Sequence, residues 1–328
     1  MKIIINDFGI KLSLKEDTII IKSKDKKEII PLNCISEIVI CNGCLLTSDL
    51  IYKCINNDIQ FNFLDRYGNP YLYIENLNNA CSPIIKRKQL LLCKNELGLK
   101  IIKNIIIQKL KNRQKHLNEL GKNRKSNIRE NIEISVKNIQ VYITFLEKLE
   151  GNNVINMRQT IQSYEGNAGR IYFKQISNLL NPQYKFDGRS FKPAKDFYNC
   201  MLNYSYGVMY GRINEYCIQA RLDPYIGIMH TDIYNKPTLT YDLIEPYRYY
   251  CEKTVFKLFS KNMVKSNMFY NLENGYFLNE IGKKVLLTEF YEVLNKKVKN
   301  NNRNITVSNK IKNDILLLAK IIGESDIC

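Results

Sequence analysis

The chain has 328 residues, of which 45% are hydrophobic, so it can bury a sizeable core and is not a disordered protein. Lysine and arginine number 49 against 32 acidic residues, which gives a formal net charge of +17. This excess is spread along the chain and indicates a polyanionic partner, because each phosphate that a basic group neutralises releases counterions. The apolar runs are far too short to cross a bilayer, so no membrane-spanning helix is expected.

The ten cysteines show no even framework, and no signal peptide precedes them. They indicate reduced thiols in a soluble, cytoplasmic protein. Cys41 and Cys44 have the spacing of zinc ligands, but the sequence holds no second such pair and only two histidines, His116 and His230. We therefore expect these two cysteines to be structural or incidental.

The N-terminal part clusters β-branched residues in short runs between polar turns, which predicts a compact β domain over residues 1–75. One helix is expected to interrupt the strands at 48–55, with Ser48 as its N-cap. The stretch RYGN at 66–69 predicts the turn of a hairpin. The runs expected to form strands are KIIIND, IKLSL, TIIIKS, EIIPL, SEIVI, IQFNFLD and PYLYI.

Residues 76–83, NLNNACSP, are expected to form a linker, and the pattern beyond them is helical. Apolar residues then recur at spacings of three and four, which predicts a long basic helix or helix pair. The stretch 119–130 is rich in Asn, Lys and Arg and is expected to be a polar loop, a candidate for disorder. The fold class is therefore α+β, with a small N-terminal all-β domain and a larger all-α domain at 84–328. Further helices are expected at 131–150, 156–180, 196–220, 246–260 and 281–297, with a last apolar segment at 311–322.

The stretch QSYEGNAGRIYF, at 162–173, places the carboxylate of Glu165 beside two glycines within a helical pattern. Glycine inside a helix costs roughly 1 kcal/mol relative to alanine, so Gly166 and Gly169 indicate a backbone that another group approaches closely. A packed helix would satisfy this requirement, and so would a ligand. On its own the stretch favours a tight helix crossing with a solvated charge.

A second group of polar residues lies further along the chain. His230 follows a short apolar run, and Asp242 and Glu245 are three residues apart, so that they can share a helix face. Taken singly, each has an ordinary explanation: the histidine as a satisfied core residue, and the two acids as residues of a helix start next to Pro246. None of them is by itself evidence of a site.

Together, these segments resemble in order and spacing the motifs of the CRISPR adaptation integrase, the first-numbered CRISPR-associated protein. The resemblance spans nearly the whole chain, and that family has an N-terminal β domain and a larger helical domain, as the strand and helix patterns also predict. The segments that carry it are EGNAGRIYF from 165, LDPYIG at 222–227, HTD from 230 and DLIEPYR at 242–248, with FDGRSFKP at 186–193, NYSYG at 203–207 and NGYFLNEIG at 274–282 in agreement.

The resemblance implies a divalent-metal site. Glu165, His230 and Glu245 match the family's metal ligands, and Asp242 matches a supporting acid, although which of the two acids binds the metal directly stays open. Two carboxylates and one neutral imidazole with open positions suit Mn²⁺ and tolerate Mg²⁺. All four residues are therefore the expected catalytic group.

The resemblance also implies activity and partners. It predicts a metal-dependent DNA endonuclease and integrase that inserts spacer DNA into a CRISPR array, with a 3′-hydroxyl attacking a phosphodiester. Arg170, Arg189 and Arg248 fall at positions suited to DNA phosphates. The expected partners are spacer-precursor and repeat DNA, a second copy of the chain bound through the β domain, and the smaller second-numbered CRISPR-associated protein.

Two other classes of protein fit part of the sequence. A tyrosine recombinase needs a cluster of arginines and histidines around one nucleophilic tyrosine, and two histidines are too few. A noncatalytic basic DNA-binding scaffold needs only the +17 charge, with the acids forming salt bridges. The scaffold stays open as the alternative, and metal dependence distinguishes it from the integrase.

Overall fold

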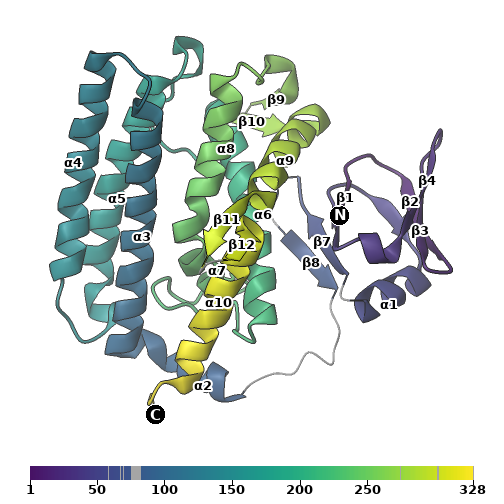
Figure 1. Cartoon of the computed structure of the whole chain (residues 1–328), viewed down its shortest axis with the longest axis horizontal. Helices are drawn as coiled ribbons and strands as arrows, with labels where there is room; N and C mark the ends of the chain where they lie inside the picture. The colour runs from purple at the N-terminus through teal and green to yellow at the C-terminus, as the bar shows by residue number, and fades with distance from the viewer. Residues whose placement is uncertain are drawn as a thin grey trace.

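A computed structural model of the chain describes residues 1–57, 59–66, 68, 70–74, 83–273, 275–300 and 303–327. Strands dominate up to Ile74 and helices dominate from Pro83 on, which confirms the predicted α+β order (Figure 1). The predicted linker lies outside the described residues except for Pro83, which begins a helix. Of the predicted turn at 66–69, residues 66 and 68 are described.

Two four-stranded sheets make up the described N-terminal part. The first sheet has the order β1-β5-β7-β8, in which β8 alone runs antiparallel to its neighbour. Its strands are β1 (Lys2–Ile5), β5 (Glu37–Ile40), β7 (Gln60–Leu64) and β8 (Pro70–Ile74). The second sheet has the order β4-β3-β2-β6, with strands β2 (Ile10–Lys15), β3 (Thr18–Lys22), β4 (Lys27–Pro31) and β6 (Cys44–Leu46). Strand β6 was not predicted, since three residues are too few to show a pattern.

The central strands of the first sheet, β5 and β7, are buried on both faces. On one face Ile38 and Phe61 pack against the second sheet, in a core that includes Leu12. On the other face Val39 and Leu64 join the core of the helical part. All four residues of β5 are buried, which explains why its run EIVI is apolar without strict alternation.

Helix α1 (Ser48–Asn56) confirms the single helix predicted among the strands. The prediction of Ser48 as its N-cap is wrong, because Thr47 occupies that position. Thr47 keeps the extended backbone that follows β6, so Ser48 is already the first helical residue.

Three long helices lie side by side at one end of the molecule, and the strand-rich part lies at the other end (Figure 1). They are α3 (Glu96–Gly121), which follows α2 (Pro83–Leu91), α4 (Ser126–Lys148) and α5 (Val154–Leu179). The prediction of a polar loop over 119–130 is wrong, because α3 and α4 are separated by residues 122–125 alone. The polar residues on either side lie on helices whose buried faces are supplied by residues such as Leu117 and Ile132.

Helix α6 (Phe197–Gln219) runs through the centre of the helical part and is buried over most of its length (Figure 1). Around it lie α7 (Thr238–Leu243), α8 (Arg248–Ser260), α9 (Glu280–Asn295) and α10 (Val307–Glu324). None of the described helices is long and apolar enough to cross a membrane.

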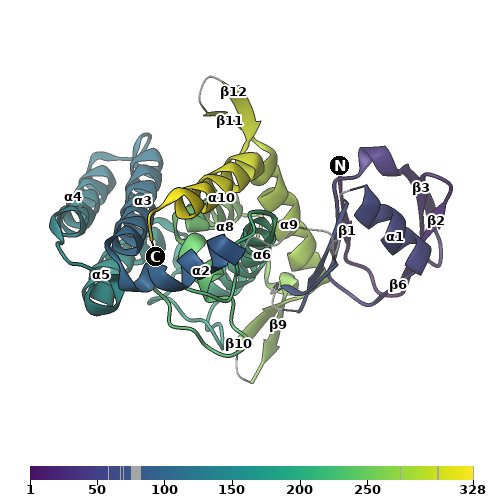
Figure 2. The same ribbon diagram turned by 90° about the horizontal axis from the view of Figure 1, so that it is seen from below.

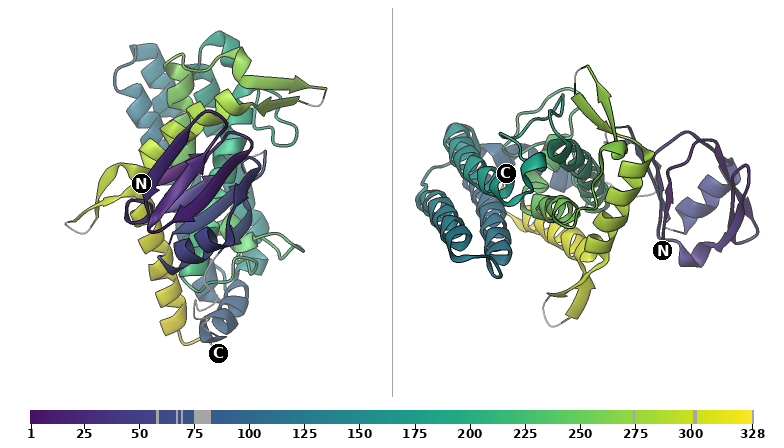
Figure 3. Two further views of the ribbon diagram at one scale, coloured as in Figure 1. Left: turned by 90° about the vertical axis from the view of Figure 1, so that its right-hand side faces the viewer. Right: turned by 90° about the horizontal axis from the view of Figure 1, so that it is seen from above.

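Two hairpins project from opposite sides of the helical body (Figures 2 and 3). One pairs β9 (Phe269–Leu272) with β10 (Gly275–Leu278), and the other pairs β11 (Lys297–Asn300) with β12 (Arg303–Thr306). The C-terminal part is therefore mostly helical but not all-α. Strands of four residues fall between the helical patterns and are too short to compete with them in a sequence window.

Candidate metal centre

The four residues of the expected catalytic group come from separate elements. Glu165 lies on α5, His230 on the loop between α6 and α7, and Asp242 on α7. Glu245 begins a short 3-10 turn, η4 (Glu245–Tyr247), directly after α7. The structure pairs Asp242 with His230, and it brings Glu165 and Glu245 to the same ammonium group, that of Lys109 on α3.

Asp242 is fully buried and fixes the orientation of His230. Its carboxylate accepts hydrogen bonds from the backbone amides of Ile228, Met229 and His230, at 2.7, 3.0 and 3.1 Å. It also lies 2.6 Å from Nδ1 of the imidazole. Because an ionised carboxylate can only accept, Nδ1 carries a proton, and in the neutral ring Nε2 keeps its lone pair.

His230 lies in the field of the acidic residues around it. Burial lowers the pKa of His230, whereas the hydrogen bond to Asp242 and the charges of Asp242, Glu245 and Glu165 raise it by more. The pKa of the imidazole therefore lies above its ordinary value.

Two cations hold Glu245, whose side chain is 5% exposed. Lys109 contacts it from α3, and Arg248 donates to it through Nε and Nη2, both at 2.9 Å. Burial alone would raise the pKa of Glu245, but the charges of Arg248 and Lys109 hold it well below its usual range. Arg248 also donates to the hydroxyl of Tyr210 at 2.7 Å, so the guanidinium that was predicted to face DNA is engaged within the protein.

A cleft of about 970 Å³ opens over the two glutamates. Glu165 and Glu245 are among its lining residues, and His230 is not. All three arginines predicted to bind DNA phosphates line the cleft, and other basic side chains line it too. The wall of the cleft is therefore strongly basic. The basic lining residues are Lys109, Arg113, Arg170, Lys174, Lys185, Arg189 and Arg248.

The two glycines beside Glu165 face this cleft. A Cβ atom at Gly166 would meet no described atom within 4 Å, and one at Gly169 would meet Nη1 of Arg113 at 3.4 Å. At Gly166 no neighbouring helix packs against α5, so the expectation of a tight helix crossing is wrong there, whereas at Gly169 the Arg113 side chain of α3 comes within contact distance. The bare backbone leaves room for a ligand to approach Glu165.

Three polar residues on the buried side of α3, near the cleft, were not predicted from the sequence to be part of the site. Lys109, Arg113 and His116 are spaced by four and three residues on the buried stripe of that helix. Arg113 pairs with the buried Glu252 at 2.6 Å, and Tyr206 donates to the same carboxylate at 2.8 Å. The sequence did hold a signal for them, because these polar residues occupy positions of α3 where the helical period favours apolar ones.

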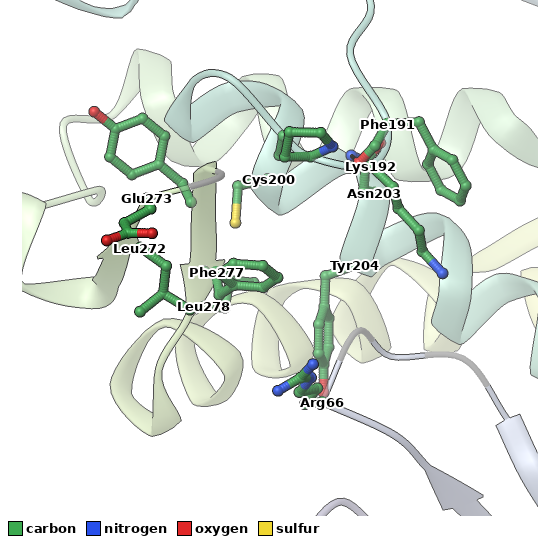
Figure 4. A pocket seen from close by; sticks show the side chains of 13 residues that line it. Arg66, Phe191, Lys192, Cys200, Asn203, Tyr204, Leu272, Glu273, Phe277 and Leu278 are labelled. Atoms are coloured by element: carbon green, nitrogen blue, oxygen red, sulfur yellow. Dashed lines mark hydrogen bonds between the residues drawn. The ribbon is translucent and has the colours of Figure 1, made fainter.

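The other segments that carry the resemblance gather around a second cavity of about 660 Å³ (Figure 4). Phe191 and Lys192 approach it from the segment 186–193, Asn203 and Tyr204 from α6, and Phe277 from β10. None of the four expected catalytic residues lines it. Two of these segments also reach the centre, because Arg189 and Tyr206 line the cleft over the two glutamates.

The donor set at the centre suits a divalent metal in kind, since it offers two carboxylates and an imidazole whose Nε2 has its lone pair. As the described residues stand, no three His, Cys, Asp or Glu side chains lie close enough to hold an ion. The ammonium of Lys109 sets the spacing of Glu165 and Glu245.

Comparison with proteins of known structure gives likenesses over 98% of the chain. A casposase bound to its integration product shares 22% identity at a TM-score of 0.81, over 90% of that chain. A Cas6-RT-Cas1–Cas2 complex shares 17% identity at a TM-score of 0.77, over 35% of that chain. At these identities the likenesses show a shared fold.

Sequence comparison goes further. A CRISPR-associated endonuclease Cas1 from Archaeoglobus fulgidus is 27% identical over 95% of this chain and 93% of its own length. The sequence profile described as "CRISPR associated protein Cas1" matches residues 3–292. Since that match spans most of the chain, this protein belongs to the Cas1 family.

Proposed function

We propose that this chain is a divalent-metal-dependent DNA endonuclease and integrase that inserts spacer DNA into a CRISPR array. One observation carries the proposal: two carboxylates, Glu165 and Glu245, meet at one cation position in the floor of a basic cleft. The family relationship supports it, since the Archaeoglobus relative is named an endonuclease and the casposase structure contains an integration product.

Glu165, His230 and Glu245 would hold the ion, Mn²⁺ or Mg²⁺, which would polarise a phosphodiester and stabilise the charge that develops during in-line displacement. Asp242 would not bind the ion directly, because its oxygens already accept hydrogen bonds from the loop and from Nδ1 of His230. Its role would be to keep Nε2 turned toward the ion.

The cleft would bind and orient the DNA. Its cations Arg170, Lys174, Lys185 and Arg189 would contact phosphates on either side of the reacting one, as electrostatic and sequence-independent contacts. The bare backbone at Gly166 lets a phosphodiester come close to Glu165. Attack by the 3′-hydroxyl of incoming DNA gives strand transfer, and attack by water gives cleavage.

The proposed partners are DNA, a second copy of the chain and the second-numbered CRISPR-associated protein. A Cas6-RT-Cas1–Cas2 complex shares the fold, which supports the last of these. Strand β4 lies at the edge of the second sheet and exposes Ile29, an edge that a second copy could cover. We propose residues 1–75 as the dimerisation part and 84–328 as the catalytic part.

The test is Glu165→Gln, which keeps the side-chain volume and removes the charge. Cleavage and strand transfer with Mn²⁺ should fall to background, while DNA binding should survive, because no cationic contact is removed. Glu147→Gln is the matched control, since Glu147 is half-exposed on α4 and its carboxylate pairs with Lys111, while Lys103 donates to its backbone carbonyl, which the variant keeps. Strand transfer at the wild-type rate in folded Glu165→Gln protein would refute the mechanism.

One observation favours the alternative, a noncatalytic DNA-binding scaffold. Lys109 pairs with both Glu165 and Glu245, as acids that serve only as salt-bridge partners would. In a scaffold Glu165→Gln would cost some stability and leave DNA binding unchanged, and Mn²⁺ would have no effect on either variant. The same pair of measurements therefore separates the two functions.

A further inference from the structure

The ammonium of Lys109 lies between two of the three proposed metal ligands. The Lys109 side chain is 5% exposed, and its Nζ pairs with Glu165 and with Glu245. These carboxylates come from helices far apart in the sequence, and Lys109 joins them from a third. A divalent ion cannot share the pair with the ammonium, because two cations at contact distance repel each other and need the same oxygens.

We propose that Lys109 competes with the divalent ion for Glu165 and Glu245, so that its ammonium closes the metal centre until an ion displaces it. This inference rests on the proposed function and concerns how the same site is loaded. Lys109 also lines the cleft, so the displaced ammonium can turn toward the cleft and remain beside bound DNA phosphates.

Lys109 is suited to this role in a way that its neighbours are not. Arg248 contacts Glu245 but not Glu165, and the hydroxyl of Tyr210 anchors it. Arg113 is held by the buried Glu252. Within the described chain the partners of the Lys109 ammonium are the two carboxylates themselves. A point charge on a flexible stem can leave them without breaking another contact, unlike the rigid fork of an arginine.

Removing the ammonium leaves a protein that can fold. Glu245 keeps the two hydrogen bonds from Arg248, so no buried charge loses its last partner. The side chain of Glu165 is 23% exposed and can be hydrated from the cleft. Methionine keeps the apolar stem of lysine within the stripe of α3, so Lys109→Met removes the charge with little change in packing.

The experiment is a calorimetric titration of the purified chain with Mn²⁺ in the absence of DNA. Lys109→Met should bind Mn²⁺ at least tenfold more tightly than wild type, which corresponds to ~1.4 kcal/mol. Lys109→Arg, which keeps a cation, should bind no more tightly than wild type. Lys111→Met is the matched control: it makes the same charge change on the same helix, but Lys111 is half-exposed and pairs with Glu147, so its affinity should be that of wild type.

Thermal melting gives a second measurement that does not depend on activity. Saturating Mn²⁺ should raise the Tm of Lys109→Met by more than it raises that of wild type. In the variant the ion fills a position without a cation, whereas in wild type it must first displace the Lys109 ammonium. An Mn²⁺ affinity in Lys109→Met equal to or weaker than wild type would overturn the competition.

Glu165→Gln separates the two possible failures. If it abolishes Mn²⁺ binding while Lys109→Met leaves the affinity unchanged, the metal site stands and the competition is refuted. If Mn²⁺ binding is indifferent to Glu165→Gln, the ion does not use this carboxylate, and the proposed function fails together with the inference built on it.

Discussion

Asp242→Asn tests how the protein holds His230. One oxygen of Asp242 accepts the backbone amides of Ile228 and Met229, and the other accepts the backbone amide and Nδ1 of His230. Asparagine has one carbonyl oxygen and one amide group that donates. Whichever way it is turned, two donors face the NH₂ group, and both of their hydrogen bonds are lost unless Nδ1 of His230 gives up its proton and accepts one.

The size of the effect follows from these contacts. A hydrogen bond to a charged acceptor contributes about 1.5 to 3 kcal/mol, so the free energy of unfolding should fall by about 3 to 6 kcal/mol if two are lost, and by about half as much if Nδ1 of His230 accepts from the NH₂ group. If the NH₂ group faces His230, Nδ1 must accept and the proton moves to Nε2, the nitrogen proposed to bind the ion. If it faces Ile228 and Met229, the loop that carries His230 loses its anchor. Mn²⁺ affinity should therefore fall in either orientation.

Chemical denaturation measures the stability, calorimetry measures the Mn²⁺ affinity, and ¹⁵N NMR of the imidazole identifies the tautomer of His230. Asp232→Asn is the control, because Asp232 lies exposed on the same loop and accepts from the amide of Gly227 at 3.1 Å and the hydroxyl of Thr238 at 3.4 Å. We expect it to cost less than about 1 kcal/mol. A folded Asp242→Asn protein with the denaturation midpoint and Mn²⁺ affinity of wild type would refute the reasoning.

Three further predictions concern other parts of the chain. Burial lowers the pKa of His116 to about 4, so between about pH 6.5 and pH 4 the unfolded state binds more protons than the folded state. The free energy of unfolding should therefore fall by ~3 kcal/mol as the pH drops through that window. Denaturation at each pH checks this, and His116→Gln should flatten the profile. Replacing Cys41 and Cys44 by serine should leave the metal content and activity unchanged, and loss of stoichiometric zinc would contradict this. The logarithm of the affinity for duplex DNA should fall linearly with the logarithm of salt concentration, and Arg170→Ala should reduce the slope by about one; a salt-independent affinity would exclude the electrostatic cleft.

The long elements could be predicted from the sequence because their periods repeat many times. The helices α5 and α6 lie within two residues of the ranges expected for them, and the strand runs up to Ile74 all form strands. The short elements could not be predicted: β6 and the two hairpins give windows of three or four residues. The polar stretch at 119–130 was predicted from its composition alone, whereas most of its residues belong to the ends of α3 and α4 and only residues 122–125 connect the two helices.

At the site, the sequence identified the side chains but not their partners. The resemblance pointed to Glu165 and Glu245, and the structure places them at one cation position. Nothing in the sequence shows that Lys109 is the cation between them, because the pairs join residues on different helices and a charge pattern does not specify its long-range partner. The choice between the helix crossing and the ligand at Gly166 also depends on the three-dimensional structure, because it is decided by the open space beside a glycine that has no Cβ atom.

The first β-sheet contributes side chains to two hydrophobic cores, so the strand-rich part and the helical part cannot be separated without exposing apolar surface. If residues 1–75 were removed from the gene, the helical part would lose the cover that Val39, Cys41 and Leu64 provide, and the buried Arg212 would lose its ion pair with Glu37. The strand-rich part produced alone would expose the same apolar face to water. Either fragment would start from a deficit in stability and a tendency to aggregate. The two parts that the sequence separates so clearly are thus expected to melt together, as one cooperative unit.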